Sequence, residues 1–177
     1  MARRKFNHQN RITNRQPAKI KAIVPGTIVE FTYIGERIFD KKPLVLVLWN
    51  NYKKYKIHGI NLNYLTDTLI KQLMREILEK DDNIRLIEES HEGDYDDTLP
   101  YRNLLNEPYT RIKLPSFKDN WGGNPLSESE AKVQMERLYN QKLKRIVKKQ
   151  DIYRTYKEDS MGTISVVQYD MRGLLEK

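Results

Sequence analysis

The chain has 177 residues, a formal net charge of +8 and no cysteine, which excludes a disulfide framework and any thiolate metal site. Its mean hydropathy of −0.77 is polar for a globular protein, so we expect one compact domain with extensions that lie outside the core. The longest apolar run, at 43–49, is too short to span a bilayer, and the basic N-terminus lacks the apolar stretch of a secretory signal. We therefore expect no membrane partner and synthesis in the cytoplasm.

Residues 1–22 are predicted to be a basic N-terminal arm, because they contain no acidic residue and few apolar ones. Such a segment cannot bury enough surface to fold alone. Two interpretations are open: a solvated tail, or an arm that becomes ordered against nucleic acid or a neighbouring subunit. The cations of the arm are Arg3, Arg4, Lys5, Arg11, Arg15, Lys19 and Lys21.

Residues 23–80 are predicted to be a β-barrel core with a following helix. Three runs rich in β-branched and aromatic residues lie at 28–34, 44–49 and 57–65, each bounded by turn residues. Every residue of the second run is apolar, so we expect both of its faces to be covered. Gly59 inside the third run predicts a β-bulge or a close approach of two backbones.

The helix is expected directly after the third run and should pack on the barrel or plug its open end. Either Thr66 or Asp67 can cap its first turn through a side-chain oxygen. One apolar stripe recurs at helical spacing: Leu69, Ile70, Leu73, Met74, Ile77 and Leu78.

Residues 81–126 are predicted to be an irregular acidic segment, rich in Asp, Asn, Pro and Gly. A stretch of this length without secondary structure is either a functional loop or a segment that becomes ordered against a partner. The acids at 88–97 lack the spacing of a calcium loop, so a solvated acidic loop is favoured over a Mg²⁺ or Ca²⁺ site.

Residues 127–177 are predicted to contain a basic helix and a C-terminal strand. Ser127 and Glu130 form a capping box at the start of the helix, which is expected to run to Lys149. Two β-rich runs follow at 153–156 and 163–169, and the second is expected to return to an edge of the first sheet.

No catalytic residue, metal ligand or cofactor is predicted. His58, the only histidine in the predicted core, could act as a general base at neutral pH. A lone histidine beside a glycine in a strand is more often a hydrogen-bonded structural residue, and we prefer that interpretation. The three histidines lie far apart in sequence, and no Gly-rich phosphate loop is present.

Binding of a polyanion is the function that the charge pattern favours. Lysines alternate with Tyr52 and Tyr55 in one predicted hairpin, a pattern in which lysines contact phosphates and rings stack on bases. An ordinary exposed hairpin is the alternative. The residues predicted to contact nucleic acid or another polyanion are Arg3, Arg4, Lys5, Arg11, Lys53, Lys54, Lys56, Lys144 and Arg145.

One stretch resembles the SH3-like small barrel of toxin endoribonucleases. The Pro25-Gly26 turn and the run Lys-Pro-Leu-Val-Leu-Val at 42–47 carry this resemblance, which covers less than a quarter of the chain. The resemblance implies a catalytic arginine at Arg37, but Asn50 and Asn51 stand where those toxins have a hydroxyl. It therefore supports the fold more than the activity.

A second resemblance covers more of the chain. Pro-Gly-x-Ile-Val-x-Phe-x-Tyr at 25–33, Pro-Leu-Val-Leu-Val at 43–47, His-Gly-Ile-Asn-Leu-Asn-Tyr-Leu at 58–65 and Tyr-Arg-Thr-Tyr at 153–156 look like small virion-associated proteins of T-even-type tailed phages, some of them DNA end protectors. The resemblance implies a structural protein of the virion, with other virion proteins and DNA as partners in a multi-subunit assembly.

We therefore expect an α+β protein: a small SH3-like β-barrel with two helices and long irregular extensions. The expected role is that of a non-enzymatic virion protein that docks on neighbouring head, neck or tail subunits. Two alternatives are a nucleic-acid-binding module of a cellular complex, which would bind bare nucleic acid with a strong salt dependence, and a toxin-like endoribonuclease.

Overall fold

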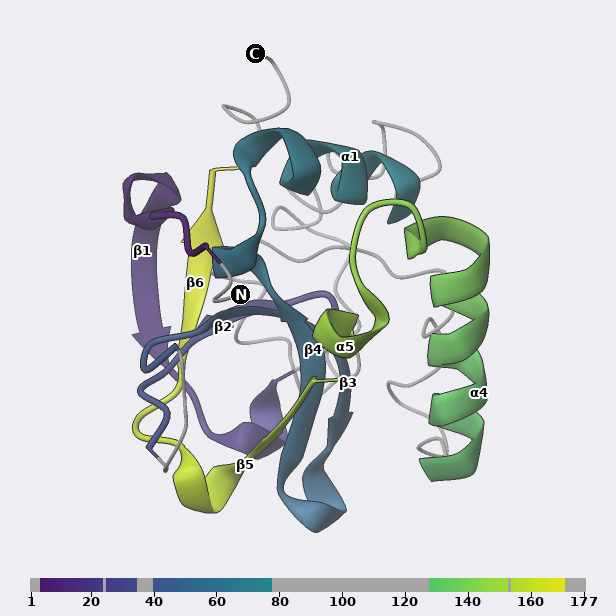
Figure 1. Ribbon diagram of the computed structural model, residues 1–177. Helices are drawn as coiled ribbons and strands as arrows, with labels where there is room; N and C mark the ends of the chain where they lie inside the picture. Colours follow the sequence, from purple (N-terminus) through teal and green to yellow (C-terminus); the bar gives the residue numbers. More distant parts are fainter. Residues whose placement is uncertain (1–3, 24, 35–39, 78–127, 153, 171–177) are drawn as a thin grey trace, which may run out of the picture.

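The computed structural model describes residues 4–23, 25–34, 40–77, 128–152 and 154–170. The fold is α+β, with six strands in one antiparallel sheet and helices against one of its faces (Figure 1). The strands are β1 (Ile12–Pro17), β2 (Ile28–Glu30), β3 (Leu44–Asn51), β4 (Lys56–Asn61), β5 (Arg154–Lys157) and β6 (Ser165–Tyr169). The helices are α1 (Asp67–Ile77), α4 (Glu128–Leu138) and α5 (Lys149–Ile152), with single turns η2 (Ile20–Ala22), η4 (Leu62–Tyr64) and η8 (Glu158–Ser160).

The strand order β1-β6-β2-β3-β4-β5 places a strand from the end of the chain between two strands from its beginning. β6 pairs with β1 from Ile12 opposite Tyr169 to Pro17 opposite Ser165, and it also pairs with β2. The predicted return of the last strand is thus confirmed. β1 was not predicted, and through it the basic arm is ordered against the sheet of its own chain.

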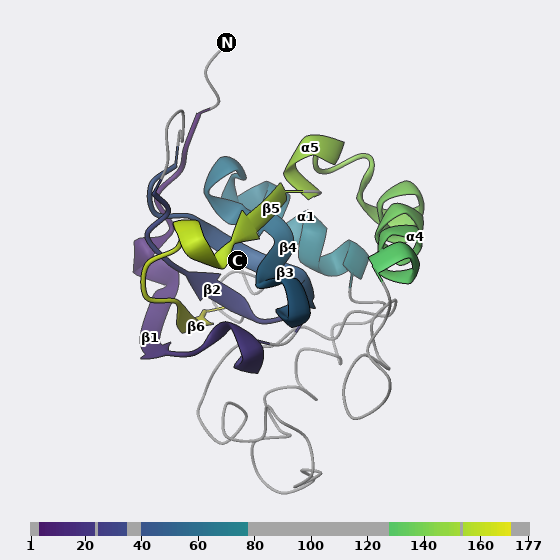
Figure 2. The ribbon, with the colours of Figure 1, turned by 90° about the horizontal axis from the view of Figure 1, so that it is seen from below.

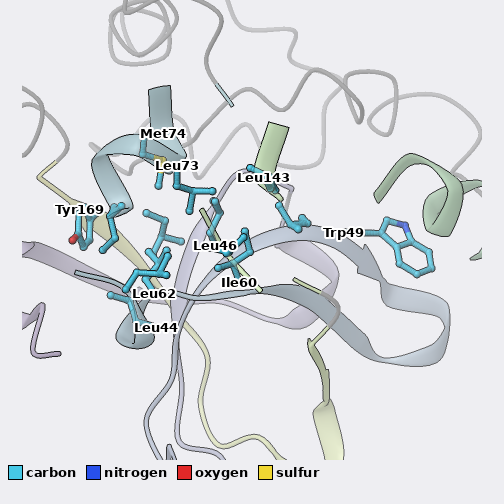
Figure 3. Packing of buried hydrophobic residues seen from close by; sticks show 14 of the residues in the cluster. Leu44, Leu46, Trp49, Ile60, Leu62, Leu73, Met74, Leu143 and Tyr169 are labelled. Carbon is cyan, nitrogen blue, oxygen red and sulfur yellow. The ribbon is translucent and has the colours of Figure 1, made fainter. Parts of the chain in front are cut away.

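β3 is the centre of the core, because all eight of its residues are buried. Leu44, Leu46 and Leu48 belong to the cluster under the helices, whereas Val45 and Val47 belong to a second cluster on the other face. Figure 3 shows Leu73 and Met74 of α1 above the strand residues of the first cluster. The prediction that this strand is covered on both faces is confirmed.

The sheet is curled, so that β5 approaches the segment that follows β2. The ring of Tyr156 on β5 lies 5.2 Å from each of the rings of Phe31 and Tyr33, edge to face in both pairs. A single β-bridge also joins Tyr33 to Met161. The described sheet has no pairing between its outer strands β1 and β5, so the structure is an open curled sheet.

The helices differ from expectation at one end of the chain. Thr66 is the cap of α1, since its Oγ1 accepts a hydrogen bond of 3.2 Å from the backbone N–H of Leu69. The basic helix, expected to run to Lys149, ends at Leu138 and gives way to a wider π-helical turn, Tyr139–Leu143, before α5. Figure 2 shows α4 on the side of the molecule remote from β1. The predicted acidic segment 81–126 and Ser127 of the capping box lie outside the described residues.

No described helix combines the length and apolar character that crossing a membrane requires.

Candidate nucleic-acid interface

The start of the chain, residues 4–11, is fastened along η4 and the beginning of α1. The backbone N–H of Phe6 donates to the Asn63 carbonyl at 2.7 Å. His8 is buried and donates from Nε2 to the Leu65 carbonyl at 2.8 Å, while its Nδ1 lies 3.3 Å from Oδ1 of Asp67. The other oxygen of Asp67 pairs with Nη2 of Arg11 at 3.2 Å. These contacts hold the basic arm in one position on the body.

A buried polar network supports this attachment from below. The carboxylate of Asp40 is 5% exposed and accepts hydrogen bonds from the side-chain amides of Asn61 and Asn63 at 2.9 and 2.8 Å. The side chain of Asn61 also accepts from the backbone N–H of Asn63 at 3.0 Å. The network fixes η4, and it thereby presents the Asn63 carbonyl to the arm. Lys5 completes it with an ion pair of 3.8 Å to Asp40.

A second buried carboxylate, Glu30, joins the arm to the centre of the sheet. It accepts from Gln9 at 2.7 Å and from Arg15 at 2.9 Å, and Nζ of Lys42 lies 3.6 Å away. Burial alone would raise the pKa of Glu30, but the hydrogen bonds from Gln9 and Arg15 and the charges of Arg15 and Lys42 outweigh it and lower this pKa. Glu30 therefore stays ionised and holds these groups within the fold.

Beside the fastened arm lies an open groove of about 290 Å³. Arg4 and Lys148 are exposed on it, and Asp151, which is buried, forms part of its wall. The guanidinium carbon of Arg4 lies 5.4 Å from the centre of the Phe6 ring, a cation–π contact. Lys144 and Arg145 are exposed in the turn that leads to the groove. The uncharged lining consists of Phe6, Tyr64, Leu65, Leu69, Ile146 and Val147.

The predicted polyanion contacts fall into three places. Arg4, Lys144 and Arg145 lie at or beside the groove. Lys5 and Arg11 form the ion pairs with Asp40 and Asp67 described above. The three hairpin lysines lie at the other end of β4 from η4 (Figure 1), and Arg3 is outside the described residues.

The hairpin between β3 and β4 is a separate basic surface. Lys53 and Lys54 are exposed, and Lys56 is the pairing partner of Lys157 across β4 and β5. Tyr55 is 51% exposed and adopts a positive φ of 53°, and its carbonyl accepts from the N–H of Glu158 at 2.9 Å. Tyr55 is therefore exposed together with Lys53 and Lys54, and their contact with a polyanion stays a prediction.

The sequence did not reveal the groove, because its walls come from three distant segments. Lys148 belongs to a basic run that was recognised, but only the fold brings it to Arg4. Phe6 is the only Phe, Tyr or Trp in the arm. This aromatic side chain in a basic segment was the one sequence signal that could have indicated the groove.

The two polar residues singled out in the core have structural roles. Nδ1 of His58 lies 3.0 Å from the hydroxyl of Thr155, and its ring stacks on Trp49 at 4.7 Å. Asn50 donates from its amide to the carbonyls of Ile20 and Ile23 at 2.6 and 2.7 Å, and so closes η2 onto β3. Within the described ranges, no three His, Asp or Glu side chains are grouped as metal ligands.

The chain matches no family model, no curated protein and no solved structure. The assignment of this surface as a nucleic-acid interface is therefore inferred from the positions and charges of its residues alone.

Proposed function

We propose that this protein is a non-enzymatic structural component of a tailed-phage particle, which docks on neighbouring subunits and binds nucleic acid at its basic groove. The observation that carries the nucleic-acid part is the convergence of Arg4 and Lys148, from opposite ends of the chain, on one groove. Lys144 and Arg145 extend the same positive surface. The phage setting depends on the resemblance at 25–33, 43–47, 58–65 and 153–156.

The contacts of the buried polar groups agree with a structural role for the protein. Asp40, Glu30 and His8 each bind the arm or the turn that supports it, so these groups maintain the fold. The curl that brings Tyr156 to Tyr33 supports an SH3-like small barrel as the underlying design of the sheet. The hairpin lysines Lys53, Lys54 and Lys56 form a second contact for a long nucleic acid.

The alternative of a nucleic-acid-binding module in a cellular complex is favoured by the same groove, since the groove does not specify the particle around it. The endoribonuclease alternative has no such support. Asn50, at the position of the expected hydroxyl, is engaged with two backbone carbonyls, and Arg37 lies outside the described residues.

The binding test uses the full-length protein and fluorescence anisotropy with a labelled oligonucleotide over a series of salt concentrations. We expect affinity to fall steeply with salt, and the double variant Arg4→Ala/Lys148→Ala to bind more weakly, with a log–log salt slope reduced by about 2. The matched control is Lys19→Ala/Lys21→Ala, which removes two exposed charges beside the other core cluster. Affinity that does not change with salt would refute the proposed nucleic-acid binding.

The proposed presence of the protein in a phage particle is tested by quantitative mass spectrometry of purified particles from a phage that encodes this chain. A fixed copy number per particle is expected for a virion component. Recovery with a host complex and absence from the particles would establish the cellular alternative instead.

A further inference from the structure

We infer that the groove between the arm and the turn before α5 is a site for one unstacked base of single-stranded nucleic acid, with the phosphate of that nucleotide at the basic rim. This assignment rests on the proposed function and specifies its ligand. Three features of the groove support it: the arrangement of its charges, the chemistry of its walls and the way its rim is held.

The charges specify an orientation for the ligand. Arg4 and Lys148 are exposed at the rim, whereas Asp151 is only 6% exposed. A phosphate is attracted to the two cations and repelled by the carboxylate, so it remains at the rim. The group that enters must be neutral, and the carboxylate favours one that carries N–H donors. Adenine, cytosine and guanine meet both conditions through their exocyclic amino groups, which thymine lacks.

The walls fit a planar, mainly apolar group. Phe6 and Tyr64 contribute rings, and Leu65, Leu69 and Val147 contribute aliphatic surface. The volume of about 290 Å³ is near the lower end of the roughly 300–1,000 Å³ typical of small-molecule sites, which suits one nucleotide. A base inside a duplex is stacked and paired and cannot enter, so the ligand is a single strand or an unpaired end.

The rim is arranged before a ligand binds. The contact of Arg4 with the Phe6 ring holds the guanidinium beside the groove, and the backbone hydrogen bond from Phe6 to Asn63 holds the main chain that carries the ring. Tyr64 follows Asn63 directly in η4. Because Arg4 and Phe6 contact each other before binding, and the backbone that carries them is held, less affinity is lost to conformational entropy.

An acidic peptide is the competing occupant, since the rim would attract its carboxylates. The buried carboxylate of Asp151 would repel any acidic side chain that entered the groove. A base is neutral and is not repelled by this carboxylate, so we favour a nucleotide as the occupant of the groove.

The test compares oligonucleotides of equal length binding to the full-length protein: a single strand of adenine and cytosine, the same strand with abasic sugars, and a duplex. The abasic strand keeps every phosphate and lacks only the bases. Stacking of one base on an aromatic wall predicts that the normal strand binds about ten-fold more tightly than the abasic strand. Phe6→Leu and Tyr64→Leu, which keep apolar bulk and remove the ring, should each reduce this ratio. Phe6→Leu should also weaken abasic binding, because Arg4 loses its contact with the ring.

Val133→Ala is the control, because it removes exposed apolar surface of α4 that does not line the groove, and it should keep the ratio. Asp151→Asn should reduce any preference for adenine and cytosine over thymine. Equal affinity of the protein for normal and abasic strands would overturn the base site and leave the salt-dependent binding of the proposed function intact. Displacement of the strand by an acidic peptide, without any dependence on bases, would overturn it in favour of a peptide groove.

Discussion

Gly59 lies at a close approach of β4 to β3. A Cβ atom at this position would meet the backbone carbonyl of Leu46 and would lie 2.6 Å from Cγ1 of Val45. Both neighbours are buried at the centre of the sheet and cannot move away easily. The predicted close approach of two backbones is therefore confirmed, and the pairing shifts register opposite Gly59, between Val47 and Trp49 of β3.

We expect Gly59→Ala to lower the free energy of unfolding by about 3 kcal/mol, the upper part of the range for an overpacked core, as measured by urea denaturation. Gly162→Ala is the control. Its Cβ would lie 3.3 Å from Cβ of Thr32, which is exposed and can adjust, so the loss should be below about 1 kcal/mol. Equal losses in the two variants would contradict this account.

Glu30 makes the stability of the fold depend on pH. Its pKa in the folded protein is below the ordinary value of 4.5, so its stabilising contribution is complete above that value and is lost as the pH falls through the lowered folded pKa. Glu30→Gln should therefore be less stable than the parent at neutral pH. The difference between the two free energies of unfolding should shrink below about pH 4.5. Two stability curves that stay parallel down to about pH 3 would contradict the prediction.

Among the elements, those with a strong local pattern were predictable and those defined by distant partners were not. β3 is apolar throughout, and α1 has a continuous apolar stripe, so both were recognised. β1 has the sequence Ile-Thr-Asn-Arg-Gln-Pro and exposes five of its six residues, so it shows no alternation of apolar and polar residues. It is a strand because β6 offers it a backbone partner, and that information lies about 150 residues away in the sequence.

The same limit applies to the groove. The apolar character of Leu69 and Val147 predicted that they would face other residues. It did not predict that the arm, whose composition indicated a segment unable to fold alone, would line the same groove. The pairing of β1 with β6 and the buried hydrogen bond of His8 hold the arm, and the ion pairs of Lys5 and Arg11 add to these contacts.

The attachment of the arm can be weakened by one substitution. His8→Ala removes a buried donor to the Leu65 carbonyl and a partner of Asp67, and should lower stability by about 1–3 kcal/mol. Hydrogen exchange should show faster exchange in residues 4–11 than in the parent, with little change in β3. Asn10→Ala, at an exposed position of the same segment, is the control. If hydrogen exchange of residues 4–11 were unchanged in His8→Ala, the other contacts would be enough to hold the arm in place.

At the scale of the whole molecule, the groove and the hairpin lie at opposite ends of β4, which is about 20 Å long for its six residues. A trinucleotide has only two internucleotide phosphates, which are adjacent, so it cannot place a base in the groove and a phosphate at the hairpin. A strand of about 30 nucleotides, roughly 100 Å long even at base-stacking distance, can reach both surfaces. Lys53→Ala/Lys54→Ala should therefore weaken binding of the long strand and leave that of the trinucleotide unchanged in competition assays.

Arg4→Ala/Lys148→Ala should weaken binding of both ligands, and the losses of the two double variants should add for the long strand because the sites are far apart. Equal effects of the hairpin substitutions on both ligands would show that the trinucleotide binds there as well.

The position of β6 has a consequence for the newborn chain on the ribosome. β1 and β2 are synthesised first, but they are not neighbours in the sheet. Residues 165–169, which form β6, must be inserted between them. Until then, the backbone of β2 has a free edge that could pair with another nascent chain. We therefore expect the sheet to be completed only after residues 165–169 have left the ribosome, and the yield in cells to depend on how long that edge is shielded by chaperones.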